Sequence, residues 1–177
     1  MIRSTLRGLA AATVLLVAVS STASAQAASG SRFGLSAGVA LPMGDFGDAA
    51  ETGIHVGGHW QTGLGEKLKL RINADIGRYG LPDGVDGNWM LIGGIANLVY
   101  PIATESGFKP YLLGGVGMYN WKIDIDGLGS TDDTNVAFNF GGGFDWGTRY
   151  FTEIKYVMID TEGTSINTLP VTIGIRF

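Results

Sequence analysis

Residues 68–77 read LKLRINADIG, the most regular alternation of side chains in the chain. Its apolar and polar side chains alternate without a break: Leu68, Leu70, Ile72, Ala74 and Ile76 alternate with Lys69, Arg71, Asn73, Asp75 and Gly77. Successive side chains of a β-strand point to opposite faces, so a period of two indicates a strand with one apolar and one polar face.

Seven further segments alternate in the same way, at residues 32–41, 53–64, 89–100, 110–124, 136–146, 149–159 and 168–177. Two are less regular. In 89–100 the polar face is set by Asn97, and Leu91, Ile95 and Val99 share that face. In 110–124 the charges of Lys122 and Asp124 indicate that even-numbered positions face inward. Shorter connections (64–67, 101–107, 147–148) alternate with mostly longer ones (42–52, 80–87, 125–135, 160–167).

An even number of strands of roughly 10 residues, with longer loops on one side, is typical of a transmembrane barrel. We therefore predict an all-β fold, an eight-stranded antiparallel up-and-down transmembrane β-barrel. A soluble barrel with an apolar interior has the same period. Its solvent face would carry many charges, whereas here the polar face is mostly small or uncharged and the apolar face is bulky. Trp60, Tyr100, Trp146, Tyr150 and Tyr156 stand near strand ends on the apolar face, as interfacial girdles require.

The composition agrees with this prediction. The 177 residues include 29 glycines, about 16% against an average of about 7%. Cysteine is absent, which excludes disulfides, thiol catalysis and thiolate metal sites. The net charge of −4 argues against nucleic acid as a partner. Ten of the 16 acidic residues lie in the four longer connections.

The N-terminus has the features of a secretory signal peptide. Arg3 and Arg7 precede an uncharged, mostly apolar run at residues 9–19, followed by the cleavage pattern Ala23-Ser24-Ala25. We expect cleavage after Ala25, or alternatively after Ala27, and a membrane anchor is the competing interpretation. The predicted domains are thus a signal peptide at 1–25, a short extension at 26–31 and the barrel at 32–177.

Three stretches carry a family resemblance: residues 34–46 (GLSAGVALPMGDF), 109–117 (KPYLLGGVG) and 169–177 (LPVTIGIRF). The chain resembles the small eight-stranded bacterial outer-membrane β-barrels of the OmpA-barrel, OmpX and OmpW-like type. The resemblance implies a location in the Gram-negative outer membrane, contact with its lipid and lipopolysaccharide, and assembly by periplasmic chaperones and the barrel-assembly machinery. The alternating C-terminal segment resembles the signal read by that machinery, through Leu169, Ile173, Ile175 and Phe177.

Several polar side chains are expected inside the barrel. We predict a structural lumen cluster of His55, His59, Lys69, Arg71, Asp75, Glu153 and Lys155, with Asp145 and Arg176 also inward. Unpaired charges in so narrow a space would be costly, so we expect ion pairs across the lumen. Arg71 and Glu153, at similar depths on the third and seventh strands, are the predicted pair.

The sequence gives less support for a metal site, a catalytic site or a calcium site at these and nearby residues. His55, His59 and Asp75 supply too few ligands for a confident metal site, and polar lumen packing is the favoured interpretation. A lipid-modifying enzyme would need His55 as base with Ser130 or Ser165, which we place on long loops outside any catalytic motif that we recognise. Asp124-Ile125-Asp126-Gly127 resembles the start of a calcium loop, but Asn135 stands where the loop's closing Glu belongs.

We therefore predict a non-enzymatic outer-membrane barrel without metal or cofactor, with acidic external loops, a lumen plugged by polar side chains, and a structural or surface-interaction role. The alternative is an OmpW-like barrel that admits small hydrophobic molecules, for which the inward Leu91, Ile95 and Val99 are the only hint.

Overall fold

Within the described residues, eight antiparallel strands close into a barrel in the order of the chain. The computed structural model describes residues 31–82, 84–105, 107–161 and 163–177. The predicted signal peptide, with Ala23 and Ala25, and the extension up to residue 30 lie outside the described residues. The strands are β1 (Arg32–Met43), β2 (Gly53–Leu64), β3 (Leu68–Gly80), β4 (Gly87–Pro101), β5 (Lys109–Ile125), β6 (Gly129–Trp146), β7 (Tyr150–Thr161) and β8 (Thr164–Arg176).

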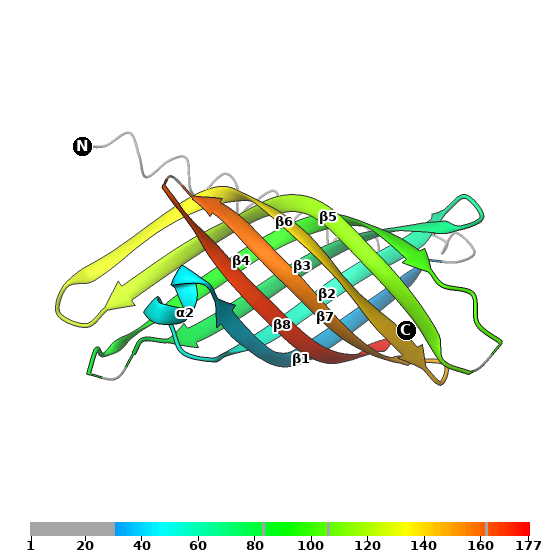
Figure 1. Cartoon of the computed structure of the whole chain (residues 1–177), viewed down its shortest axis with the longest axis horizontal. Coiled ribbons are helices and arrows are strands. Elements are labelled where there is room, and N and C mark those ends of the chain that lie inside the picture. Colours follow the sequence, from blue (N-terminus) through cyan, green and yellow to red (C-terminus); the bar gives the residue numbers. More distant parts are fainter. Residues whose placement is uncertain (1–30, 83, 106, 162) are drawn as a thin grey trace. The chain divides into compact units, whose positions relative to one another are not determined.

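Closure comes from β1, which pairs with β2 on one side and with β8 on the other. Ala37, for example, lies opposite Val56 on β2 and opposite Ile173 on β8. The strands are strongly tilted, and a short helix, α2 (Asp45–Ala49), lies toward the end opposite the C-terminus (Figure 1). We call these the α2 end and the C-terminal end of the barrel. A closed sheet leaves no unpaired edge, which is the condition for crossing hydrocarbon with strands.

The alternation of β3 places its polar residues inside and its apolar residues outside, as predicted. Ile72 and Ile76 are 43% and 51% exposed, whereas Arg71 and Asp75 are buried. The same arrangement, polar inside and apolar outside, holds around the barrel. A soluble barrel has the opposite arrangement. The buried polar residues are His55, His59, Gln61, Arg71, Asn73, Asp75, Asn97, Asn139, Glu153, Lys155, Thr168, Thr172 and Arg176.

The predicted inward face of β5 was wrong. Odd-numbered positions face the lumen: Tyr111 and Tyr119 are buried, whereas Met118 is 55% exposed. Lys122 and Asp124 misled the assignment because they lie on the outer wall toward the tip of β5, beyond the last apolar outward residue. Outward charges are tolerated there because that part of the strand need not face hydrocarbon. The inward assignment of Leu91, Ile95 and Val99 on β4 is confirmed, since all three are buried.

The connections at the α2 end differ from the predicted long loops. β5 and β6 continue to a tight turn at residues 126–128, so most of the expected loop at 125–135 is strand. β7 and β8 likewise continue to residues 161 and 164. Gly127 has a positive φ of 82°, which the tight turn requires and other residues rarely adopt. Among the described residues, only the first connection forms a helix, α2, which is too short for a periodic sequence signal.

Much of the lumen glycine makes room for large inward rings on the neighbouring strand. A Cβ on Gly93 would lie 2.3 Å from the ring of Tyr119, its partner across β4 and β5. A Cβ on Gly174 would lie 2.3 Å from the ring of Phe151, its partner across β8 and β7. Glycine opposite an aromatic residue is a known device for fixing strand register and curvature. The high glycine content therefore belongs to the packing of a narrow interior.

The outer wall is apolar, and two pairs of its aromatic residues lie at the C-terminal end. Trp146 stacks on Tyr150 with a ring-centroid distance of 5.0 Å, and Phe108 lies 4.6 Å from Phe144. Among the described residues, no helix has the length and hydropathy that a transmembrane helix requires.

Candidate functional site

The lumen toward the C-terminal end is filled by a continuous polar network. Arg71 of β3 reaches across the barrel and pairs with Glu153 of β7, through Nη1 and Oε2. The predicted cross-lumen pair is therefore present. The Tyr111 hydroxyl donates a hydrogen bond of 2.8 Å to the same carboxylate, and Arg71 Nε donates one of 3.0 Å to Gln61.

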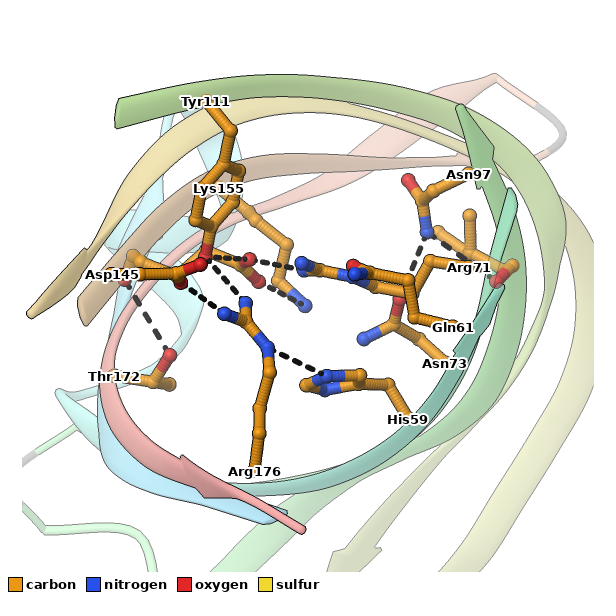
Figure 2. Close-up of polar contacts among 12 residues, drawn as sticks. His59, Gln61, Arg71, Asn73, Asn97, Tyr111, Asp145, Lys155, Thr172 and Arg176 are labelled. Atoms are coloured by element: carbon orange, nitrogen blue, oxygen red, sulfur yellow. Dashed lines mark hydrogen bonds and ion pairs between the residues drawn. The ribbon is translucent and has the colours of Figure 1, made fainter. Parts of the chain in front are cut away.

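Arg176 forms the second centre of this network. Figure 2 shows its guanidinium directed into the lumen, between Asp145 and His59. It pairs with Asp145, and its Nε lies 3.3 Å from Nε2 of His59. The guanidinium also lies over the Phe151 ring, 4.3 Å from its centroid. These contacts join the last strand to β2, β6 and β7 and thus tie the closing seam of the barrel to its interior.

Asp75 forms the third centre, closer to the α2 end. Its Oδ2 accepts a hydrogen bond of 3.1 Å from the Tyr119 hydroxyl and lies 3.7 Å from Lys155 Nζ. Lys155 in turn lies 3.6 Å from Glu153 and so links two carboxylates. His55 Nε2 lies 3.4 Å from Asp75 Oδ1. Every buried charge therefore has an opposite charge beside it, which is the condition under which such groups are tolerated.

Toward the α2 end the lumen becomes apolar. A buried cluster joins side chains of seven strands, all but β2, with Phe46 and Ala50 of the first connection, and Trp89 and Trp121 pack against it. Phe46 contacts the rings of Tyr79 and Trp89 edge-on, at centroid distances of 5.2 and 5.3 Å. The Trp89 indole N–H donates a hydrogen bond to the Ala49 carbonyl oxygen. The helix α2 is thereby anchored over the apolar layer. Its strand residues are Ala40, Tyr79, Leu91, Ile95, Tyr119, Ala137, Val157, Ile159 and Ile166.

The seven predicted lumen residues all come from β2, β3 and β7 and face inward. Six are buried, whereas Lys69 lies near the C-terminal mouth and is partly exposed. Sequence reasoning missed Tyr111, which hydrogen-bonds to Glu153 and Arg176, and Tyr119, which hydrogen-bonds to Asp75, because of the wrong face assigned to β5. The odd-numbered glycines Gly115 and Gly117 were an available signal, since inward glycines recur on β4, β6 and β8.

The two histidines do not converge. His55 contacts Asp75, whereas His59 contacts Arg176 and the Phe151 ring, edge-on at 5.3 Å. A cation such as a metal ion would be repelled by the arginine beside His59. In the described part of the chain, no group of three or more His, Asp or Glu side chains is placed to hold a metal ion.

The alternative catalytic residues are also separated. His55 is buried in the lumen, whereas Ser130 and Ser165 lie in β6 and β8, not on long loops as predicted. Ser165 accepts a hydrogen bond from Asn167, and no hydrogen bond joins either serine to His55 among the described residues. Asp124 is also part of a strand, paired with Ser130 across the hairpin, so its stretch does not form a calcium-binding loop.

The predicted assembly residues of β8 share its outer face. Ile173 and Phe177 are exposed, and Leu169 and Ile175 are partly exposed. Phe177 is tied to the barrel by a backbone hydrogen bond of 2.8 Å to Phe33. These residues are therefore presented to the surroundings of the barrel, and their reading by the assembly machinery stays a prediction.

An apolar outer wall around an ion-paired lumen is typical of barrels that lie in a membrane. Residues 11–177 match the family model described as the outer membrane protein beta-barrel domain. The chain belongs to this family. The family resemblance and the eight-stranded barrel expected from the sequence are thus confirmed, and the protein is a component of the cell outer membrane. No curated protein matches the chain significantly.

Solved structures show the same fold in this outer-membrane barrel family. Neisserial surface protein A is 19% identical with a TM-score of 0.63, and the match covers 84% of this chain and 96% of that one. Ail, the attachment invasion locus protein of Yersinia pestis, is 16% identical with a TM-score of 0.61, covering 84% and 99%. The outer membrane enzyme PagL is 13% identical with a TM-score of 0.54, covering 82% and 98%. The fold thus serves both surface proteins and an enzyme, and activity depends on the residues placed on it.

Proposed function

We propose that this outer-membrane barrel is a closed, non-enzymatic scaffold that holds a rigid acidic hairpin outside the cell for surface interaction. The α2 end is then extracellular and the C-terminal end periplasmic. The observation that carries the proposal is the hairpin of β5 and β6, which continues past the apolar belt of the outer wall.

The hairpin is long and internally braced. The last apolar outward residue of β5 is Met118, and the strand continues to Ile125, about 24 Å at 3.4 Å per residue. Asn120 Nδ2 hydrogen-bonds to the Asp133 carbonyl and to Thr134 Oγ1, both at 3.1 Å. The Trp121 indole N–H donates a bond of 2.8 Å to Asn135. Side chains as well as backbone hydrogen bonds join the two strands. Because the hairpin is already ordered, binding to a partner would cost little conformational entropy.

The charge of the hairpin indicates the kind of partner. Asp124, Asp126, Asp132 and Asp133 stand against one cation, Lys122, which lies 3.7 Å from Asp124. The turn residue Leu128 is 84% exposed at the tip. An acidic hairpin with an apolar tip favours a partner whose surface is cationic and partly apolar. Complementary charge raises the rate at which the two associate.

The filled lumen supports the scaffold role. The cross-lumen pairs occupy the periplasmic half of the barrel, and the apolar cluster beneath α2 occupies the extracellular half. We expect reconstituted protein in planar bilayers to show little steady conductance. A large, steady single-channel current in wild type would contradict a closed barrel.

The interaction is tested with the full mature chain in lipid nanodiscs and polylysine-coated surfaces as the probe. Asp132→Asn combined with Asp133→Asn should reduce binding severalfold at low salt, and the difference should shrink as salt screens the charges. The matched control is Glu66→Gln combined with Glu105→Gln, which removes the same charge at the periplasmic end. Equal binding of both double variants would exclude the hairpin as the contact.

A second candidate, admission of small hydrophobic molecules, is favoured by one observation. Leu91 and Ile95 face the lumen in a layer that α2 covers through Phe46. If the helix lifts, an apolar interior opens to the outside. Uptake of a small apolar dye by cells carrying the protein, increased by Phe46→Ala, would support this candidate, and uptake equal to that of cells lacking the barrel would exclude it.

The proposal extends to how the barrel is assembled and which lipids surround it. The outward residues of β8 that end in Phe177 support recognition by the barrel-assembly machinery after chaperoned transit through the periplasm, and the apolar belt fits outer-membrane lipid and lipopolysaccharide. Lipid analysis of membranes with and without the protein tests the non-enzymatic role, since a lipid product that disappears in His55→Ala would contradict it.

A further inference from the structure

The C-terminal mouth of the lumen contains a cavity with an excess of positive charge. Its volume is about 80 Å³, room for a few water molecules or one small oxyanion. Lys69, Arg71, Lys109 and Arg176 line it together with one carboxylate, Asp145. Four cations face one anion there, a balance of +3, or +2 when Glu153 is counted as the partner of Arg71.

Two of these cations, Lys69 and Lys109, form no ion pair among the described residues. Arg176 is paired with Asp145, and Arg71 with Glu153. Among the described residues, no carboxylate lies within ion-pair distance of Lys69 or Lys109. Lys69 is held on the inward face of β3, opposite Val99 of β4, so its ammonium group shares the narrow mouth with both arginines. Like charges brought together in a partly dry space repel, and an anion among them would relieve that repulsion.

Arg71 supplies the second, independent observation. Its side chain is 1% exposed, yet Nη2 has no hydrogen-bond partner among the described residues. Nε is bonded to Gln61 and Nη1 to Glu153, so the guanidinium is fixed with one donor left over. A buried donor without an acceptor costs free energy, and a fixed guanidinium donor is well suited to an oxyanion.

We propose that this cavity is a binding site for a small oxyanion, a phosphate or a carboxylate. Arg71 and Lys69 are its principal ligands, and Lys109 draws the anion in from the mouth. In the orientation proposed above, the ligand enters from the periplasm. The site is separate from the hairpin, so a failure of the proposed surface interaction would not affect the proposed oxyanion site, and the reverse also holds.

The experiment uses the full mature chain, folded in neutral detergent micelles and labelled with ¹⁵N at arginine. Inorganic phosphate and acetate are titrated separately at constant ionic strength, with chloride as the balancing anion. We expect a saturable shift of the Arg71 side-chain resonance with at least one oxyanion, and the tighter of the two identifies the ligand class. A shift that grows linearly, or that chloride reproduces, would overturn the proposal.

The matched variants are Lys69→Gln and Lys67→Gln. Both remove one lysine charge near the same turn, but Lys67 is exposed outside the cavity. Lys69→Gln should weaken binding by about tenfold, the effect of losing one charge-assisted contact, and Lys67→Gln by less than about twofold. Equal affinities in the two variants would refute the site. If Lys69→Gln fails to fold, exposed Lys109→Gln decides instead: weaker binding supports the site, and unchanged binding overturns it.

Discussion

The Arg71–Glu153 pair allows the sharpest test of how the lumen holds the barrel together. Glu153→Ala removes the carboxylate that contacts Arg71 Nη1, the Tyr111 hydroxyl at 2.8 Å and Lys155 Nζ at 3.6 Å. Lys155 keeps Asp75 at 3.7 Å, and Arg71 keeps its hydrogen bond to Gln61 and its position over the Tyr111 ring, 5.1 Å from the centroid. The main cost is therefore one buried guanidinium without a counter-charge.

Breaking a buried pair from one side typically costs about 3–5 kcal/mol. With a urea m-value of about 2 kcal/mol/M, a loss of 4 kcal/mol lowers the unfolding midpoint by about 2 M. Unfolding of the barrel in lipid vesicles, followed by tryptophan fluorescence and by gel mobility before and after boiling, measures this shift. Glu153→Gln keeps the shape and an acceptor for Tyr111, and should cost less than Glu153→Ala.

The double variant with Arg71→Ala gives the test of pairing. Once the guanidinium is gone, removing Glu153 no longer leaves it unpaired, so the double variant should be more stable than the summed single effects by about 1–3 kcal/mol. Lys155 and Tyr111 remain in both backgrounds, which keeps the coupling below the full cost of either single change. Additivity within about 0.5 kcal/mol would refute the reasoning.

Three further changes probe the packing, the membrane belt and the helix. Gly93→Ala should lower the urea midpoint or block folding, because its methyl group meets the Tyr119 ring, and Gly93→Ala in a Tyr119→Ala background should recover part of the loss. Ile72→Arg, at the centre of the outward apolar run of β3, should cost about 2–4 kcal/mol in vesicle unfolding, and an unchanged midpoint would contradict a lipid-facing position. Phe46→Ala should raise protease cleavage within the first connection while leaving the barrel's heat-modified gel shift intact.

The strand pattern was predictable because the lipid belt imposes one rule on every strand within it. Between Leu68 and Ile76, each outward residue must be apolar, so the period of two reads directly from the sequence. The rule weakens where the wall leaves the lipid. Lys122 and Asp124 lie in that part of β5. Their polarity indicated the inner face, and the predicted inward and outward faces of the strand were therefore exchanged.

The interior was only partly predictable. Arg71 and Glu153 could be paired from depth and position around the barrel, because few other inward charges lay at their level. Tyr111 and Tyr119 were harder to place, since an aromatic side chain suits the lipid face and a ring-filled lumen equally well, and only the odd-numbered glycines of β5 indicated the inward face. Helix α2 also escaped prediction, because five residues show no helical period and its place depends on Phe46 contacting Tyr79 and Trp89, which are distant in sequence.

The tight turn at residues 126–128 makes the β5–β6 hairpin a natural place to carry foreign sequence. Leu128 has no packing to lose, and the strands on either side are paired from Ile125 and Gly129 inward. Insertions are best tolerated at such exposed tips, where no buried backbone is disturbed. An epitope placed between Gly127 and Leu128 would be lifted clear of the membrane on a braced stem. If the α2 end is extracellular, as proposed above, cells bearing this barrel could be labelled, sorted or captured through a segment that the barrel's own fold does not need.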